Sequence, residues 1–250
     1  MILLFDVGNT NIVLGIAENN KIVETYRFIT NANLTEDEYY SKFKSVLKDK
    51  TVEGIAISSV VPLVDQTLVS MSVKYFNISP LVIGPGIKSG VKIKIENPKQ
   101  LGADLLCDAV GAKLYYKETC IIVDLGTATK FIVVTKNNEF LGGAIAPGIM
   151  TSLTNMINSA AKLSNINISI PEKVIGNDTQ SCIQSGIIYG FASMIDGMID
   201  KIKKELNDEN VKVVLTGGLS QTVKNVIQTK VHYLPNVLLE GLLTVYNKNN

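Results

Sequence analysis

Short apolar runs recur along the chain, and Gly or Asn residues separate them. The runs are rich in β-branched residues, a pattern typical of strands. In each half of the chain three such runs come first, and longer segments with helical signals follow. We expect strands at residues 2–7, 12–16, 21–28, 54–58, 81–83, 120–124, 130–135, 139–145 and 211–215.

The segments between and after these strands carry helix start signals. Thr35 and Glu38 form a capping box, and Pro62 suits the first turn of a helix. We expect further helices at residues 97–116, 148–162, 179–206 and 237–246. Strands mixed with helices in this order predict an α/β fold whose sheets are covered by helices.

Two of the predicted strands end in the same motif. Asp6 opens Asp-Val-Gly-Asn-Thr, and Asp124, about half the chain further on, opens Asp-Leu-Gly-Thr-Ala. One repeat in each half indicates a duplicated domain. We therefore expect an N-terminal domain at residues 1–118 and a C-terminal domain at residues 119–250.

The Gly-Asn-Thr turn after the first strand has the chemistry of a phosphate site. Gly8 allows a tight turn with accessible N–H groups, and Asn9 and Thr10 add side-chain donors. Asp6 is placed to hold hydrated Mg²⁺. A plain hairpin turn would explain one copy equally well. Two copies, with a Gly-Gly turn after the strand at 211–215, favour a nucleotide held between duplicated domains.

Composition narrows the possible partners. The net charge is +1, from 24 basic and 23 acidic residues, which gives no basic field for nucleic acid and no polybasic run for a membrane surface. No run approaches the roughly 18 apolar residues of a membrane span. Cys107, Cys120 and Cys182 are widely spaced, as in reduced cytoplasmic thiols. We expect a cytoplasmic protein that binds neither nucleic acid nor membrane.

A second chemical signal lies at the start of the helix expected after Asn97. Asp104 follows Gly-Ala there, and phosphoryl transfer needs a carboxylate that orients a hydroxyl and takes its proton. The alternative is a charge that stabilises the helix start. Asp108 is a competing base, which we expect instead on the helix surface. His232 is the only histidine, so histidine-based triads are not expected.

The ordered set of motifs identifies a resemblance. The motifs DVGNTN, NPKQLGAD, DLGTAT, GGAIAPGI, AAKL, QSGIIYG, TGGLS and LEGLL follow one another as in type III pantothenate kinases, and the resemblance runs from Met1 to about Tyr246. That family belongs to the acetate kinase, sugar kinase, Hsp70 and actin superfamily. The resemblance implies duplicated actin-like (ribonuclease H-like) domains with a nucleotide cleft between them. It also implies ATP-dependent phosphorylation of pantothenate to 4'-phosphopantothenate, the first step of coenzyme A biosynthesis.

The resemblance also implies roles for single residues. It places ATP and its phosphates on Asp6, Val7, Gly8, Asn9, Thr10, Asn11, Ile12, Val13 and Thr127. It places pantothenate on Gly102, Ala103, Asp104, Leu105 and Thr179. Asp104 is then the catalytic proton acceptor, and Asp124 the ligand of a monovalent cation, K⁺ or NH₄⁺. Thr179 matches a residue that reaches pantothenate across a dimer interface, which implies a homodimer.

Three positions depart from the usual family pattern. Leu105 replaces an arginine, whose two-pronged hydrogen bonding to a substrate carboxylate leucine cannot supply. Lys130 and Ile132 replace a threonine and an aspartate. Lys130 could fold back so that its ammonium partly replaces the monovalent cation at Asp124. The alternative is a strand residue that faces solvent.

Two other functions stay open beside a working pantothenate kinase. The chain could be a catalytically idle relative that binds nucleotide or metabolite as a regulator, or a kinase for another small hydroxy compound. Leu105 favours these alternatives. The retained residues Asp104, Asp124 and Thr127 favour the pantothenate kinase.

Overall fold

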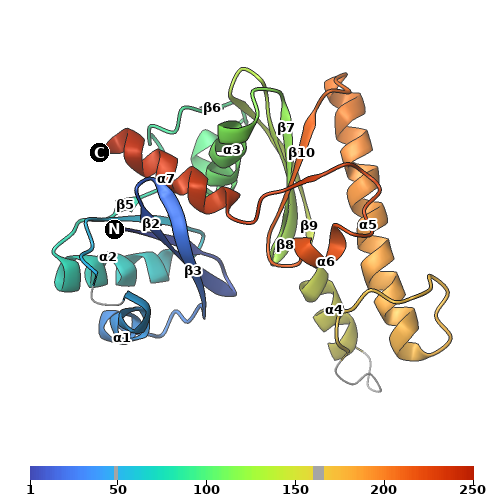
Figure 1. Ribbon diagram of the computed structural model, residues 1–250, viewed down its shortest axis with the longest axis horizontal. Helices are drawn as coiled ribbons and strands as arrows, with labels where there is room; N and C mark the ends of the chain where they lie inside the picture. The colour runs from blue at the N-terminus through green and yellow to red at the C-terminus, as the bar shows by residue number, and fades with distance from the viewer. Residues whose placement is uncertain (48–49, 160–165) are drawn as a thin grey trace. The chain divides into compact units, whose positions relative to one another are not determined.

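The computed structural model of the protein describes residues 1–47, 50–159 and 166–250. These residues form two compact units (Figure 1). Unit 1 consists of Met1–Tyr115, Asn138–Phe140 and Asn236–Asn250. Unit 2 consists of Tyr116–Asn137 and Leu141–Pro235.

The sheet of unit 1 has five strands in the order β3-β2-β1-β4-β5. The strands are β1 (Ile2–Val7), β2 (Asn11–Glu18), β3 (Lys21–Ile29), β4 (Gly54–Ser59) and β5 (Leu81–Val82). β1, β2 and β3 form an antiparallel meander, whereas β4 pairs in parallel with β1 and with β5. β1 is therefore the central strand, and its end at Asp6 lies between two neighbours.

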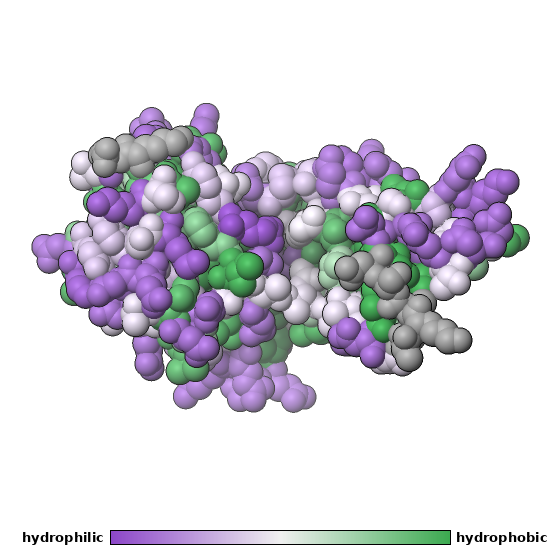
Figure 2. Space-filling model, turned by 90° about the horizontal axis from the view of Figure 1, so that it is seen from below, coloured by the Kyte–Doolittle hydropathy of each residue, from purple (hydrophilic) through white to green (hydrophobic). Residues whose placement is uncertain are grey.

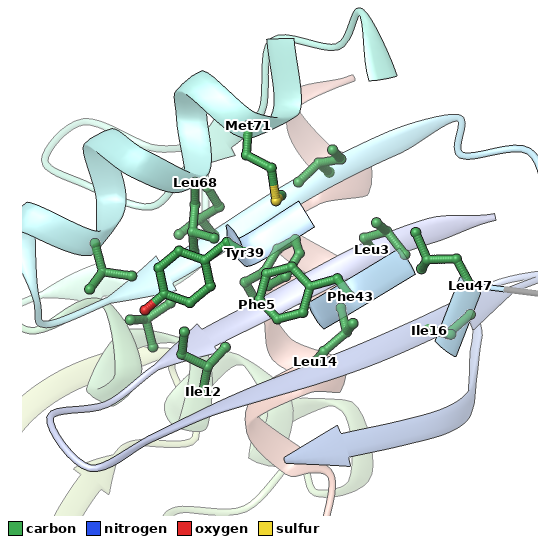
Figure 3. Packing of buried hydrophobic residues seen from close by; sticks show 14 of the residues in the cluster. Leu3, Phe5, Ile12, Leu14, Ile16, Tyr39, Phe43, Leu47, Leu68 and Met71 are labelled. Atoms are coloured by element: carbon green, nitrogen blue, oxygen red, sulfur yellow. The ribbon is translucent and has the colours of Figure 1, made fainter. Parts of the chain in front are cut away.

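Alternation along β1 divides the apolar core of unit 1 between the two faces of the sheet. Leu3 and Phe5 belong to one cluster and Leu4 to another, as the period of two in a strand requires. Helices α1 (Glu36–Leu47) and α2 (Pro62–Phe76) cover the first face. Figure 3 shows Phe5 against Phe43 of α1, and their ring centroids lie 5.1 Å apart.

The second face of this sheet is covered by α3 (Ala103–Tyr115) and by α7 (Val237–Asn249) from the end of the chain, which lie side by side in Figure 1. A Cβ atom on Gly111 would lie 1.9 Å from the Val237 carbonyl oxygen, and one on Gly241 1.9 Å from the Cys107 carbonyl oxygen. The two helices therefore approach each other through glycines. This packing places the C-terminal helix in unit 1, whereas the sequence prediction assigned residues 119–250 to one contiguous domain.

The second sheet has six strands in the order β11-β10-β7-β8-β9-β6. They are β6 (Lys92–Ile93), β7 (Cys120–Leu125), β8 (Ala128–Val134), β9 (Glu139–Pro147), β10 (Lys212–Thr216) and β11 (His232–Tyr233). β7 pairs antiparallel with β8 and parallel with β10, so its position matches that of β1 in the first sheet. β6 pairs with the first residues of β9, Glu139 and Phe140, which are grouped with unit 1.

The helices of unit 2 are α4 (Ile149–Asn158), α5 (Thr179–Leu206) and the short α6 (Ser220–Val223). α5 contributes Ala192, Ile195 and Ile199 to the apolar cluster of this unit. By length and composition α5 is also long enough to cross a membrane, the one such helix in the described part of the chain. Its buried stripe is what an amphipathic core helix requires.

Most predicted strands and helices are confirmed, with shifts of a few residues at their ends. The helix expected from residue 97 is different: Pro98–Gln100 forms only a 3-10 turn (η1), Leu101 is extended, and α3 begins at Ala103. Asp104 therefore lies in the first helical turn. The expected end of the helix at 148–162 and the Ala-Ala-Lys-Leu motif lie outside the described residues.

Candidate functional site

The hairpin between β1 and β2 is closed by hydrogen bonds to the backbone of Gly8. The Gly8 N–H donates to the Asn11 carbonyl at 2.9 Å, and the Thr30 hydroxyl donates to the Gly8 carbonyl at 2.7 Å. Asn9 and Thr10, at the tip, are exposed. The tip therefore presents the amide and hydroxyl groups expected of a phosphate-binding turn.

Two residues expected in this turn have their side chains elsewhere. Val7 and Ile12 are buried in the core beneath α1 and α2. Their side chains cannot reach a ligand at the exposed tip, so any contact they make with phosphate must come from the backbone. Backbone N–H groups are suitable donors for phosphate oxygens in such turns.

Asp104 is held in a defined position at the start of α3. Its Oδ1 accepts a hydrogen bond from the Leu105 N–H at 2.9 Å. A Cβ atom on Gly102 would lie 2.5 Å from the same oxygen, so a side chain at residue 102 would displace the carboxylate. Asp104 and Leu105 are both half-buried. Ala103, also expected near substrate, is buried.

Three carboxylates of unit 1 gather around Cys107. Burial raises the pKa of this thiol well above its usual value, the nearby Ser58 hydroxyl acts the other way, and the charges of Asp108, Asp6 and Asp104 raise the pKa further. The thiol therefore stays protonated and is not a nucleophile. Asp104 lies three residues before Cys107 on α3, on the same side of the helix, and Asp6 lies beside Ser58 in the pair β1–β4.

The expectation that Asp108 is a charge on the helix surface was wrong. Asp108 is fully buried, because α3 packs both against the sheet and alongside α7, and its residues from Leu106 to Ala112 are all buried. Sequence reasoning also missed Ser58. It lies directly beside Asp6 in the parallel pair β1–β4, and polar residues at the ends of neighbouring parallel strands were the signal that could have identified it.

Asp124 occupies the matching position in unit 2 and is paired with Lys130. The two residues are directly opposite each other in the antiparallel pair β7–β8, which places their side chains on the same face. The Lys130 Nζ lies 2.6 Å from Asp124 Oδ2. The sequence left a solvent-facing Lys130 open as the alternative, and the structure supports the folded-back side chain instead.

The turn after Asp124 is fixed by contacts to the elements that follow it. The Thr127 carbonyl accepts hydrogen bonds from the Gly148 N–H at 3.1 Å and the Thr151 hydroxyl at 2.7 Å. Gly217 has φ +94°, and a Cβ atom there would lie 2.5 Å from the Leu125 nitrogen. Thr127 itself is exposed at the tip. The second hairpin and the Gly-Gly turn therefore lie against each other.

Thr179 is the first residue of α5, in unit 2. Asp178 caps the helix: its Oδ1 accepts a hydrogen bond from the Ser181 N–H at 3.0 Å, and hydrogen bonds from Ser181 lower the pKa of this carboxyl group. Thr179 is exposed, and Ile175 close before it is 87% exposed. The segment therefore presents a polar residue and a large apolar side chain to the outside of unit 2.

Comparison with known proteins decides the family. Residues 2–201 match the family described as type III pantothenate kinase. The type III pantothenate kinase of Acholeplasma laidlawii is 41% identical over 249 residues, which cover 100% of this chain and 99% of that protein. The chain belongs to the type III pantothenate kinase family. Membership makes it a pantothenate kinase, a phosphotransferase of the first step of coenzyme A biosynthesis.

Solved structures resemble this pantothenate kinase in fold. A putative Baf family transcriptional activator from Campylobacter jejuni aligns with a TM-score of 0.61 at 19% identity, over 99% of this chain and 98% of the other. Component A of (R)-2-hydroxyglutaryl-CoA dehydratase from Acidaminococcus fermentans aligns with a TM-score of 0.56 at 16% identity, over 98% and 96%. These likenesses confirm the predicted duplicated α/β fold of the actin-like class.

Proposed function

We propose that this kinase transfers the γ-phosphoryl group of ATP to the hydroxyl of pantothenate with Asp104 as general base. One observation carries the assignment: the Leu105 N–H holds the Asp104 carboxylate at the start of α3, at 2.9 Å. A base must be positioned before it can take a proton from the acceptor hydroxyl. The Leu105 N–H and the space left by Gly102 provide that positioning.

The hairpin tip of unit 1 is proposed to bind the ATP phosphates. Its proposed donors are the side chains of Asn9, Thr10 and Asn11 and the backbone N–H groups of the exposed residues Asn9 and Thr10, because the Gly8 N–H already donates to the Asn11 carbonyl. Thr127, exposed on the corresponding hairpin of unit 2, is proposed as a further ATP contact. In both places short polar residues follow a buried strand, which is the arrangement a phosphate group requires.

Mg²⁺ is proposed to bind with the nucleotide through water on Asp6. Among the described residues, no group of three or more His, Cys, Asp or Glu side chains is arranged to hold a metal ion. One carboxylate suits Mg²⁺, because this ion usually keeps several waters and binds through one or two carboxylates plus substrate phosphates. The ion would supply charge neutralisation for the transferred phosphoryl group.

Leu105 is the feature that favours a different acceptor. It stands directly after Asp104 and is half-buried, where the family pattern has an arginine. Without that arginine, a carboxylate-bearing substrate loses a two-pronged partner in the stretch 102–105. Another small hydroxy compound, one without a carboxylate, is therefore the second candidate acceptor.

A homodimer is proposed because Thr179 would complete the substrate site of a second copy. Large apolar side chains are exposed on unit 2: Ile145 on β9 at 69%, Met150 on α4 at 48%, and Ile175 before α5 at 87%. Figure 2 shows apolar residues among the hydrophilic ones on the face that it presents. Exposed apolar side chains mark an interface where they form one continuous patch, and the proposed dimer requires that these do.

The cytoplasm is the proposed location. Cys107 and Cys182 are free cysteines, and Cys182 is exposed. Free thiols of this kind persist in a reducing compartment.

A coupled assay of ADP release tests the proposed activity. ADP release that requires both Mg²⁺ and pantothenate is the expected result. A panel of small alcohols with and without a carboxylate tests the second candidate acceptor in the same assay. If no acceptor in the panel supports ADP release, although the protein is folded and still binds MgATP, both kinase proposals are contradicted. That result would favour the catalytically idle relative.

A further inference from the structure

Lys130 and Asp124 form an ion pair that is largely removed from solvent. Their side chains are only 17% and 11% exposed. The pair of Lys212, on β10, and Glu118, just before β7, differs: it spans 3.5 Å, and its side chains are 36% and 48% exposed. The first pair is therefore a fixed feature of the sheet, whereas the second is an ordinary surface contact.

The strand pattern leaves Lys130 little choice of direction. Its neighbours Thr129 and Phe131 are both buried, with Phe131 in the apolar cluster of unit 2. Because successive side chains alternate between the faces of a strand, Lys130 must point to the opposite face. Asp124 points to that same face, since Val123 and Leu125 on either side of it belong to the apolar cluster.

A free monovalent cation does not fit this arrangement. The family resemblance implies K⁺ or NH₄⁺ at Asp124. In this chain an ammonium group already lies 2.6 Å from Asp124 Oδ2. A second cation against the same carboxylate would stand next to that like charge, and like charges at such a distance repel each other strongly in a site with little water.

We propose that Lys130 is the built-in cation of Asp124, so that this kinase takes up no free monovalent cation there. The inference rests on the proposed place of Asp124 at the cation position. An ammonium group and K⁺ carry the same charge, and a tethered group does not have to be collected from solution. The side chain therefore replaces an ion whose binding would otherwise depend on its concentration.

Thermal unfolding in KCl and in choline chloride, matched in ionic strength, tests the proposal without an activity measurement. The unfolding midpoint of the wild type is expected to be the same in both salts. Lys130→Thr removes the ammonium and opens the position to K⁺. At about five times its dissociation constant, K⁺ should then raise the midpoint by about 2–4 °C in a chain of this size.

Two further variants serve as controls. Lys130→Arg keeps a cation at the position and should unfold at the same midpoint in both salts. Lys212→Thr removes the lysine that pairs with exposed Glu118 and should also show no preference for K⁺. If Lys130→Thr does not fold, the wild type and Lys130→Arg still decide whether K⁺ stabilises a chain that already carries its own cation.

Two results would overturn the proposal: stabilisation of the wild type by K⁺ over choline, or equal midpoints in both salts for folded Lys130→Thr. ADP release in the same salts separates this question from the proposed function. Wild-type activity in choline equal to that in KCl is the expected result, and an activity that requires KCl contradicts the built-in cation. If pantothenate-dependent ADP release is absent in both salts, the proposed function is contradicted. The unfolding midpoints then still decide the role of Lys130.

Discussion

The two Asp-x-Gly hairpins follow equivalent strands of their sheets, but the residues opposite the two aspartates differ. Asp6 faces Val13 across the antiparallel pair β1–β2, and Asp124 faces Lys130 across the pair β7–β8. Valine contributes no charge to its partner. Lysine forms an ion pair of 2.6 Å with the aspartate opposite it.

This difference indicates how a duplicated fold can divide its chemistry. Both units keep the backbone course of strand, tight turn and strand, because that course depends on buried apolar residues and a glycine. The charge at the strand end depends on one residue of the neighbouring strand. In unit 1, which also carries the proposed base Asp104, Asp6 lies beside Ser58 in the pair β1–β4. In unit 2 the carboxylate of Asp124 is neutralised by the chain itself.

The largest effect is expected at Asp104, the proposed base of unit 1. The comparison of the two units fails if unit 1 does not carry this base. Asp104→Asn keeps the shape of the side chain and removes its ability to take a proton. We expect kcat for pantothenate phosphorylation to fall by about 10²–10⁴-fold, with MgATP binding retained, as measured by ADP release and by nucleotide titration.

Asp65→Asn is the matched control for Asp104→Asn. Asp65 is also an aspartate in the first turn of a unit 1 helix, and burial raises its pKa. If Asp104 only stabilised a helix start, the two variants would lose stability to a similar degree and keep turnover. Full turnover in folded Asp104→Asn would refute the assignment of the base.

A smaller effect is expected at the unit 2 aspartate, on stability. Asp124→Asn leaves the Lys130 ammonium largely buried without its counter-charge. We expect the free energy of unfolding to fall by about 2 kcal/mol, measured by urea unfolding. Glu118→Gln breaks the exposed pair with Lys212 and should leave the unfolding curve unchanged. Equal curves for Asp124→Asn and the wild type would show that the ion pair does not stabilise unit 2.

A smaller effect, on the KM for pantothenate, is expected at Leu105. It tests whether unit 1 binds the substrate carboxylate. Leu105→Arg restores a two-pronged donor beside Asp104. We expect the KM for pantothenate to fall by about tenfold, about 1.4 kcal/mol, and the KM for an uncharged analogue to stay the same. A fall for both substrates, or for neither, would argue against a carboxylate contact at residue 105.

Sequence patterns predicted the parts of this molecule that depend on local order. The strands that carry Asp6 and Asp124 near their ends were recognisable from short apolar runs and the glycines after them. The first turn of α3 around Asp104 was recognisable as a helix start, although Leu101 delays it. These features are determined by residues close together in the sequence, and hydrophobic periodicity and turn residues predict such local structure.

Packing between distant segments was not predictable in the same way. Asp108 is buried because α7, from the far end of the chain, lies against α3. The close approach at Gly111 and Gly241 becomes visible only once the two helices are paired. Lys130 had two possible directions until strand register placed it opposite Asp124.

The KM for MgATP of three proteins tests the division between the hairpins most directly: the wild type, Asp6→Asn and Asp124→Asn. If Asp6 holds the hydrated Mg²⁺ of the nucleotide and Asp124 is neutralised by Lys130, Asp6→Asn raises this KM by about tenfold, about 1.4 kcal/mol, and Asp124→Asn leaves it unchanged. The account is contradicted if Asp124→Asn raises the KM for MgATP as much as Asp6→Asn does, or if Asp6→Asn leaves it at the wild-type value.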